Sequence, residues 1–326
     1  MKIESGNSLW SDAWLRLKKN RMAFISLWIV VGIILSSFLI PIIGEIFAPK
    51  DEAYRAEHYW FKDPDKQSLA NKFQGPSGNH WLGTDQAGRD LFSRLLYGGQ
   101  VSLLVGLLAT LISMAIGICY GAISGYKGGK TDSILMRIVD VLYGLPFLVI
   151  VILFSVFIKA WAQQSVGFLK NDWGWGEGLI NITVNYLPLC VAIGILGWYT
   201  MARVVRSQVL SSKKLEYVEA AVSLGLSHKN ILFKQILPNL LGPIIVYTTL
   251  TIPGFILTEA GLSYLGLGVE SPNSSWGLLL QEGANYMETQ PRLLIVPSIV
   301  FALTLLALNF LGDGLRDALD PKASKD

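Results

Sequence analysis

The stretch that most resembles a catalytic motif is residues 124–131, which read SGYKGGKT. A phosphate-binding loop has the pattern G-x-x-x-x-G-K-[ST], follows a strand and holds phosphates with its backbone amides. That pattern requires glycine at the position of Ser124, and a long apolar run precedes the stretch where a strand should be. We therefore expect no ATP site and no catalysis in this chain.

Metal chemistry has as little support in the sequence. The histidines His58, His80 and His228 are scattered through polar segments, so neither an HExxH motif nor a paired Cys/His zinc site is expected. Cys119 and Cys190 both fall in apolar runs and form no disulfide framework. The sequence predicts no metal site and no cofactor in this chain.

Ionisable residues in the middle of apolar runs would indicate a proton or ion relay. Asp140 and Arg137 stand at the start of one run, where we expect an interfacial ion pair, and Glu259 and Asp313 stand at the ends of two others. A charge at the bilayer centre costs roughly 2.5–3.5 kcal/mol. The positions of these residues argue against an ion-coupled carrier, and against a membrane-embedded enzyme, which would need convergent titratable groups.

Long uncharged runs dominate the chain, which is 52% hydrophobic and 16% charged. Soluble domains are about 25% charged. Six runs without Asp, Glu, Lys or Arg approach or exceed the roughly 20 residues that cross a bilayer as a helix. We predict an all-α polytopic membrane protein whose six transmembrane helices contain residues 22–44, 95–126, 141–158, 178–202, 235–258 and 293–312.

These runs divide the chain into an N-terminal segment (1–22), a first span (23–44), a polar segment (45–94), a five-span block (95–312) and a tail (313–326). A cleaved signal peptide is the alternative for the first run, because Arg16, Lys18, Lys19 and Arg21 precede it. The run is longer than the roughly 7–15 residues of a signal peptide, and no small-x-small cleavage site follows Pro41. We therefore expect a retained span.

The distribution of cations sets the expected orientation. With the amino end inside, the two shorter outer loops hold only Lys159, Lys170 and Arg292, whereas the inner segments hold most of the remaining Lys and Arg. Cytoplasmic loops are enriched in these residues. We therefore predict a cell-membrane protein with both termini in the cytoplasm. The net charge of +3 is too small to argue for nucleic-acid binding.

Small residues recur every fourth position along the second span. Such a stripe lets another helix approach closely, which favours helix association in lipid. We predict a packing face here, against a helix of this chain or of a second subunit. The residues are Ala109, Ser113, Gly117, Gly121 and Gly125.

Just before that span, Leu91, Phe92, Leu95 and Leu96 recur at helical spacing. This pattern is typical of a short amphipathic helix at the outer interface. It fits an extension of the second span equally well. Both interpretations remain open at this point.

Residues 216–239 read EYVEAAVSLGLSHKNILFKQILPN, too charged to span a membrane. Gly225 can take the left-handed conformation that ends a helix, and Ser227 can cap a second one. Pro238 disfavours helix at Leu237 and is expected to begin the fifth span. We predict a helix-turn-helix elbow in the cytoplasm whose side chains available to pack are Tyr217, Val218, Ala221 and Leu224.

The EAA tripeptide at 219–221, followed by Gly225 and by Leu237 with Pro238, resembles the EAA loop of ABC importer permeases. The sequence departs from the general pattern at one position, where Gln235 replaces isoleucine. The resemblance implies that a coupling loop at about 213–238 docks on an ATPase subunit. The coupling residues it implies are Glu216, Tyr217, Val218, Glu219, Ala220, Ala221, Leu224, Gly225, Leu237 and Pro238.

Further segments resemble the second permease subunit of dipeptide, oligopeptide and nickel importers. They are residues 82–94, 259–268, 275–277 and 311–321. In the first of them, turn and capping roles are the alternative to a functional role. Its motif residues are Gly83, Thr84, Asp85, Gly88, Arg89 and Asp90.

The resemblance implies a type I ABC importer permease fold with a five-helix core at 95–312, to which the first span is an addition. The expected function is ATP-driven import of peptides, and the alternative solute is nickel or another small solute. The expected partners are a homologous permease, two ATPases that bind ATP and Mg²⁺, an extracytoplasmic solute-binding protein and membrane lipid. A secondary carrier or channel would instead show inverted repeats or mid-span charges. The resemblance assigns no solute-contacting residue to this chain.

Overall fold

A computed structural model describes residues 9–51, 59–171, 176 and 180–319 of the chain. Within these residues, six helical segments are long and apolar enough to cross a membrane, which confirms the predicted all-α polytopic fold. They are α2 (Arg21–Ile46), α4 (Leu91–Lys127), α6 (Phe147–Asn171), η2 with α8 (Ile182–Tyr186 and Leu187–Ser212), α12 (Leu241–Tyr264) and α14 (Arg292–Leu319).

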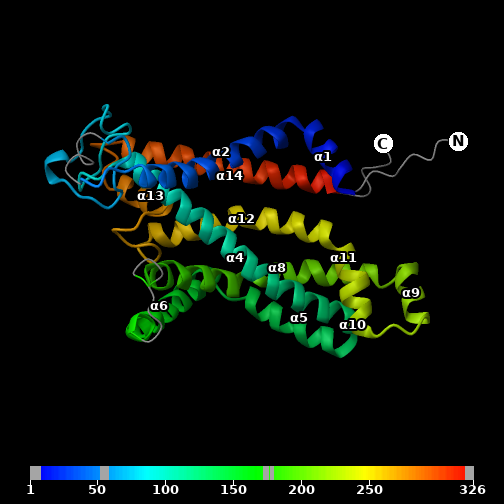
Figure 1. Ribbon diagram of the computed structural model, residues 1–326. Helices are drawn as coiled ribbons and strands as arrows, with labels where there is room; N and C mark the ends of the chain where they lie inside the picture. Colours follow the sequence, from blue (N-terminus) through cyan, green and yellow to red (C-terminus); the bar gives the residue numbers. More distant parts are fainter. Residues whose placement is uncertain (1–8, 52–58, 172–175, 177–179, 320–326) are drawn as a thin grey trace.

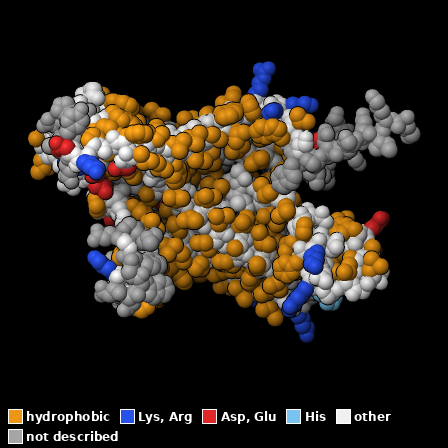
Figure 2. Space-filling model, viewed as in Figure 1, with side chains coloured by type: hydrophobic (Ala, Val, Ile, Leu, Met, Phe, Trp, Pro, Cys, Tyr) orange, Lys and Arg blue, Asp and Glu red, His pale blue; other side chains and the backbone are white. Residues whose placement is uncertain are grey.

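Shorter helices gather at the two ends of this bundle (Figure 1). We call one the α9 end, where α1 (Leu9–Lys19), α9 (Glu216–Ser223) and the C-terminal end of α14 lie. The other is the α13 end, named after α13 (Trp276–Ala284), which lies there with the segment that precedes α4. Figure 2 shows hydrophobic side chains over the middle of the molecule and charged ones mainly toward the ends, as expected of a membrane protein.

The longest helix, α4, packs along α8 through its small residues. A Cβ on Gly117 would lie 2.6 Å from the Met201 Cβ, and one on Gly121 would lie 2.3 Å from the Ala202 oxygen. The backbones are therefore too close for any side chain at these positions. The stripe predicted from the sequence faces a helix of this same chain, and its five members, Ala109, Ser113, Gly117, Gly121 and Gly125, are all buried.

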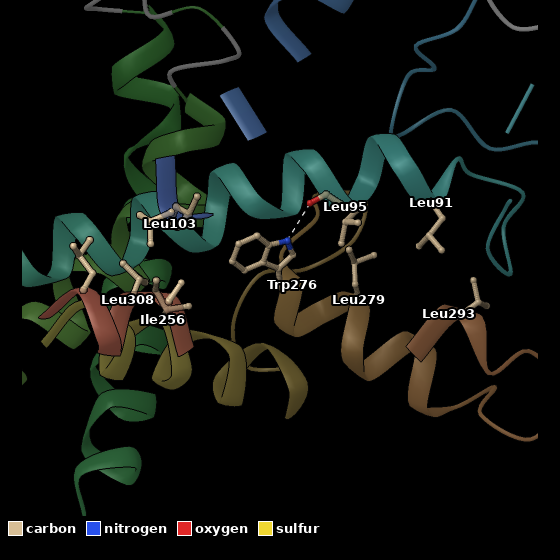
Figure 3. Close-up of a cluster of buried hydrophobic side chains, with 11 residues drawn as sticks. Leu91, Leu95, Leu103, Ile256, Trp276, Leu279, Leu293 and Leu308 are labelled. Atoms are coloured by element: carbon tan, nitrogen blue, oxygen red, sulfur yellow. Dashed lines mark hydrogen bonds between the residues drawn. The ribbon is translucent and has the colours of Figure 1, made fainter. Parts of the chain in front are cut away.

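A second core lies toward the α13 end, around Trp276 (Figure 3). The Trp276 side chain is fully buried, and its indole Nε1 donates a hydrogen bond to the Leu95 oxygen at 3.1 Å. This core joins α4, α12, α13 and α14 through Leu91, Leu95, Leu103, Ile256, Leu279, Leu293 and Leu308.

The segment around the third span differs from the prediction. Residues 141–158 are not one helix: α5 (Gly129–Tyr143) ends, and α6 begins at Phe147. Pro146 lacks an N–H and disfavours helix in the residue before it, which accounts for the break. For residues 91–96, the sequence left open a separate interfacial helix or an extension of the second span. Leu91 begins α4 itself, and Leu95 and Leu96 are buried, so the extension is correct.

Candidate functional site

The first arm of the elbow is α9, which ends as its sequence predicts. Gly225 has φ +74°, in the left-handed region. Its N–H bonds the Val222 oxygen at 3.0 Å, and the Leu226 N–H bonds the Ala221 oxygen at 3.2 Å. These two bonds are the Schellman ending of a helix, which satisfies carbonyls that would otherwise have no partner. The turn after α9 is therefore fixed by the backbone of Gly225.

The second arm starts where predicted but continues where a break was expected. Ser227 caps α10 (His228–Asn230) by accepting the Asn230 N–H at 3.4 Å. The π-helical segment η3 (Ile231–Ile236) and α11 (Leu237–Asn239) follow without interruption. The prediction that Leu237 is non-helical is wrong, because the wider π turn before Pro238 accommodates the proline ring. The break comes at Leu240, and α12 starts after it.

One face of the elbow is buried against its own chain. Val218 and Ala221 are 4% and 5% exposed, and they pack with Ile231 and Ile236 of the second arm and Val205 of α8. The expectation that Val218 and Ala221 are available to another protein is wrong. The buried apolar face of α9 is covered by the second arm of the elbow, in one cluster with Val205 and Val209 of α8. The two arms of the elbow are therefore packed together and onto α8.

The opposite face of the elbow is exposed and partly apolar. Leu224 is 81% exposed, Val222 56% and Leu215 49%. Tyr217 is half-buried. Leu224 caps α9 next to the Gly225 turn, so its side chain extends from the end of a fixed helix. The exposed residues that surround these apolar side chains include Glu216, Glu219 and Ala220, and on the second arm Leu237 is half-buried and Pro238 exposed.

Polar contacts also connect the elbow to α4. The Lys213 Nζ donates to the Tyr126 backbone oxygen at 2.6 Å, and the Tyr126 hydroxyl lies 3.0 Å from His228 Nδ1. Lys213 ends α8 just before the elbow and His228 begins α10, so the entry to the elbow and its second arm contact the same residue of α4. The elbow therefore moves with α4 as well as with α8.

Helix α5 is joined to α8 by two ion pairs. Both carboxylate oxygens of Asp132 accept hydrogen bonds from Arg206. These bonds hold the pKa of Asp132 below its ordinary value. Asp140 pairs with Arg203 at 2.5 Å, and not with Arg137 as expected, because α8 lies alongside α5. A displacement of α8 would therefore be transmitted to α5.

At the α13 end, the motif at 82–94 builds a buried ion-pair network that we call the charged cap: Asp85, Arg89, Arg94 and Glu282. Asp85 Oδ2 accepts from Arg89 Nε at 2.8 Å and from the Arg94 guanidinium at 2.7 Å. Arg94 also pairs with Glu282 of α13 at 2.5 Å. Burial raises the pKa of Glu282, but Arg94 and Arg89 outweigh it and lower the pKa overall.

The other motif residues have turn and capping roles. Asp90 caps α4 by accepting the Ser93 N–H at 2.8 Å, and its other oxygen lies 2.9 Å from His80 Nδ1. Thr84 accepts the Gln74 N–H at 2.8 Å. Gly83 and Gly88 have φ of +77° and +72°, which favours glycine. Turn and capping roles, the alternative to a functional role for this motif, therefore account for the contacts of these residues.

Glu259 is a buried acid whose contacts were not predicted from the sequence. It is fully buried in α12 and accepts hydrogen bonds from the hydroxyls of Ser102 and Ser263, each at 2.7 Å. The Ser102 hydroxyl also accepts a hydrogen bond from the backbone N–H of Trp276 at 3.2 Å. Glu259 therefore connects α4 and α12 to the start of α13. Two features of the sequence could have predicted these contacts: Glu259 stands at the end of an apolar run, and the neighbouring motifs contain serines.

A cavity of about 230 Å³ lies among the spans. None of the described residues that line it is charged. Its walls come from α4, α6, α8 and α12 and mix hydroxyl with apolar side chains. Among them are Ser113, Phe147, Tyr199, Thr251, Phe255 and Thr258.

Comparison with known proteins places the chain among transport components. Residues 117–325 match the family described as binding-protein-dependent transport system inner membrane component. Residues 8–76 match the N-terminal TM domain of oligopeptide transport permease C.

Relatives match over nearly the whole chain. The dipeptide transport system permease protein DppC of Bacillus subtilis is 42% identical over 95% of this chain and 85% of its own length. The oligopeptide transport system permease protein OppC of the same organism is 41% identical over 98% and 91%. The glutathione transport system permease protein GsiD of Pectobacterium atrosepticum is 36% identical over 96% and 91%.

These matches confirm the resemblance that the EAA tripeptide and the terminal motif at 311–321 indicate, although the end of that motif lies outside the described residues. The chain therefore belongs to the family of binding-protein-dependent transport system inner membrane components, as a multi-pass permease of the oligopeptide and dipeptide group.

Proposed function

We propose that this chain is the permease subunit of an ATP-driven importer that carries peptides across the cell membrane. It would pair with a homologous permease, accept solute from an extracytoplasmic binding protein at the α13 end, and place both of its termini and the α9 end in the cytoplasm. The names of the relatives, which refer to dipeptide, oligopeptide and glutathione transport, support a peptide solute.

The observation that carries the coupling part of this proposal is the exposed apolar end of a rigidly held α9. Leu224 is 81% exposed, while Val218 and Ala221 on the other face of the same helix are buried. A partner ATPase would cover Leu224. ATP and Mg²⁺ bind in two such partner subunits, and this chain supplies no catalytic group.

The elbow would transmit movement of the ATPases to the spans. Because Val218 packs against α8 and Lys213 bonds α4, a displacement of the elbow displaces both helices. The Arg206 to Asp132 pair carries that displacement to α5. Helices α4 and α8 line the uncharged cavity, which would form this chain's part of the solute path.

Uptake measurements in cells that lack this chain test the proposal. Labelled dipeptide, oligopeptide, glutathione and nickel would be supplied separately, and the chain restored on a plasmid. We expect ATP-dependent uptake of at least one of the peptides to return, and nickel uptake to stay unchanged. Peptide uptake that does not depend on the chain would overturn the assignment. Restoration of nickel uptake alone would show the alternative solute.

A further inference from the structure

Helix α1 offers a surface that the proposed transport function does not use. It is an 11-residue helix with Arg16, Lys18 and Lys19 in its last turn. A single non-helical residue, Asn20, separates it from α2, and the Asn20 side chain caps α2 by accepting the Ala23 N–H at 3.2 Å. Figure 1 shows α1 turning from the end of α2 to lie beside the end of α14. The orientation of α1 is therefore fixed at its C-terminal end.

One face of α1 holds it against α14. Ala13 and Leu17 are 8% and 4% exposed and pack with Ala23 and Ala318. Gly314 of α14 leaves room for this packing, because a Cβ there would lie 3.3 Å from Leu17 Cδ1 of α1 and 2.1 Å from the Ala23 Cβ of α2. This packing means that the other face of α1 also has a fixed direction.

That other face combines apolar and cationic side chains. Trp14 and Leu15 are 45% and 51% exposed. Lys18 lies with its Nζ 5.1 Å from the centre of the Trp14 ring. Lys18, Lys19 and Arg21 are exposed, and no ion pair joins them to another described residue. In Figure 2, basic side chains protrude from the surface over α1.

The position of α1 relative to the membrane follows from its neighbours. The uncharged run of α2 begins at residue 22, and that of α14 ends at residue 312, two residues before the Gly314 contact. Both spans therefore leave the hydrocarbon at the level of α1. Aromatic and basic side chains at this level insert their apolar parts and extend their charges to the headgroups.

We propose that the exposed face of α1, with Arg21 at the start of α2, binds anionic phospholipid. Trp14 and Leu15 lie against the acyl chains, and Lys18, Lys19 and Arg21 lie against the headgroup phosphates. The charge of the face decides the occupant, because cations near a membrane surface attract anionic lipids and not zwitterionic ones. The proposal is independent of the transported solute and of the ATPase partners.

Native mass spectrometry of the full-length chain in detergent tests this proposal, with phosphatidylglycerol and phosphatidylcholine titrated separately. The variant Lys18→Gln/Lys19→Gln/Arg21→Gln should bind phosphatidylglycerol more weakly by roughly fivefold for each cation removed. Phosphatidylcholine binding should be unchanged. The matched control is Lys127→Gln/Lys130→Gln/Arg137→Gln, which removes three exposed cations of α4 and α5 at the same end. Thermal unfolding of both variants checks the fold.

Two further arms distinguish a lipid surface from a phosphate site. Trp14→Ser/Leu15→Ser should weaken the binding of both lipids at this site, and free glycerol 3-phosphate should not displace phosphatidylglycerol. The proposal is overturned if the α1 variant keeps its preference for phosphatidylglycerol, or if the control loses that preference equally. Displacement by glycerol 3-phosphate would also overturn it.

Discussion

At the α13 end, Arg94 is fully buried and pairs with Asp85 and Glu282, whereas at the α9 end the buried residues of the elbow, such as Val218 and Ala221, are apolar. Both regions fix a connecting segment to the bundle. The charged cap does so with directional bonds among buried groups, which leave little of it available to another protein. The elbow does so mainly with one apolar face of a short helix, together with the contacts of Lys213 and His228 to Tyr126, and its other face is exposed.

This difference indicates a different role for each region. Removing one partner of a buried ion pair leaves an uncompensated charge, so such a network tolerates little change. The elbow is held by an apolar cluster and by polar contacts to Tyr126, so a force on its exposed face would displace it together with α8 and α4. We therefore interpret the cap as a fixed structural part and the elbow as the part that meets a partner and moves.

The largest expected effect is on the cap. Arg94→Leu leaves the two buried carboxylates of Asp85 and Glu282 with Arg89 as their one remaining arginine. One buried negative charge then has no compensating cation, and we expect the free energy of unfolding to fall by about 3–5 kcal/mol. Unfolding of the purified chain in detergent measures it. The control is Lys159→Gln, which breaks a pair at 2.8 Å with the exposed Glu270 and should cost less than about 1 kcal/mol. Equal losses for the two variants would contradict the role of burial.

A second substitution tests the helix pair that connects the two ends. Gly121→Leu places a side chain where the Ala202 oxygen is 2.3 Å from the Cβ position. The α8 backbone cannot yield without displacing the elbow, so we expect a loss of roughly 1–3 kcal/mol or more. The control is Gly32→Leu, because no atom lies within 4 Å of that Cβ position. A stable Gly121→Leu variant would mean that α4 and α8 are not in close contact.

The turn of the elbow should be sensitive in function more than in stability. Gly225→Leu meets no atom within 4 Å, so its cost is the left-handed backbone, roughly 1–2 kcal/mol. We expect the chain to remain in the membrane at normal abundance, with ATP-dependent uptake abolished. Gly225→Asn, which tolerates this backbone, should keep most of the uptake. Normal uptake by the leucine variant would remove the elbow from the coupling mechanism.

Acid should weaken the cap by a smaller amount. The pKa of Glu282 is lowered in the folded chain by Arg94 and Arg89, against the opposite effect of burial. The ionised group therefore contributes stability at pH values above its ordinary pKa of 4.5, and this contribution is lost as the pH falls through the lower folded value. In Glu282→Gln the unfolding midpoint should vary less over this range. Parallel profiles for the variant and the parent chain would contradict this.

The sequence alone was sufficient for the features that depend on local chemistry. Uncharged runs located the spans, because each must cross the hydrocarbon without charges. Gly225 and Ser227 predicted the turn and the cap of the elbow, since both conformations depend on one residue and its nearest neighbours. The every-fourth-residue stripe of α4 predicted a close helix contact.

Features that depend on distant residues were missed or mistaken. The Arg94 to Glu282 pair joins residues 188 positions apart, and no local pattern indicates it. Val218 and Ala221 were expected to be available to another protein, because the residues of the second arm and of α8 that cover them are not adjacent to them in sequence. The helix at Leu237 survives the following proline because of a π turn that propensity does not predict.

The most direct test of the account compares two leucines of similar exposure at opposite ends. Leu224 of the elbow is 81% exposed and Leu69, before the charged cap, is 77% exposed. Glutamate at either position should leave the fold intact. Co-purification of the ATPase subunits with the tagged permease should be lost in Leu224→Glu, by about tenfold or more, and kept in Leu69→Glu. Equal recovery of the ATPases with both variants would contradict docking at the elbow.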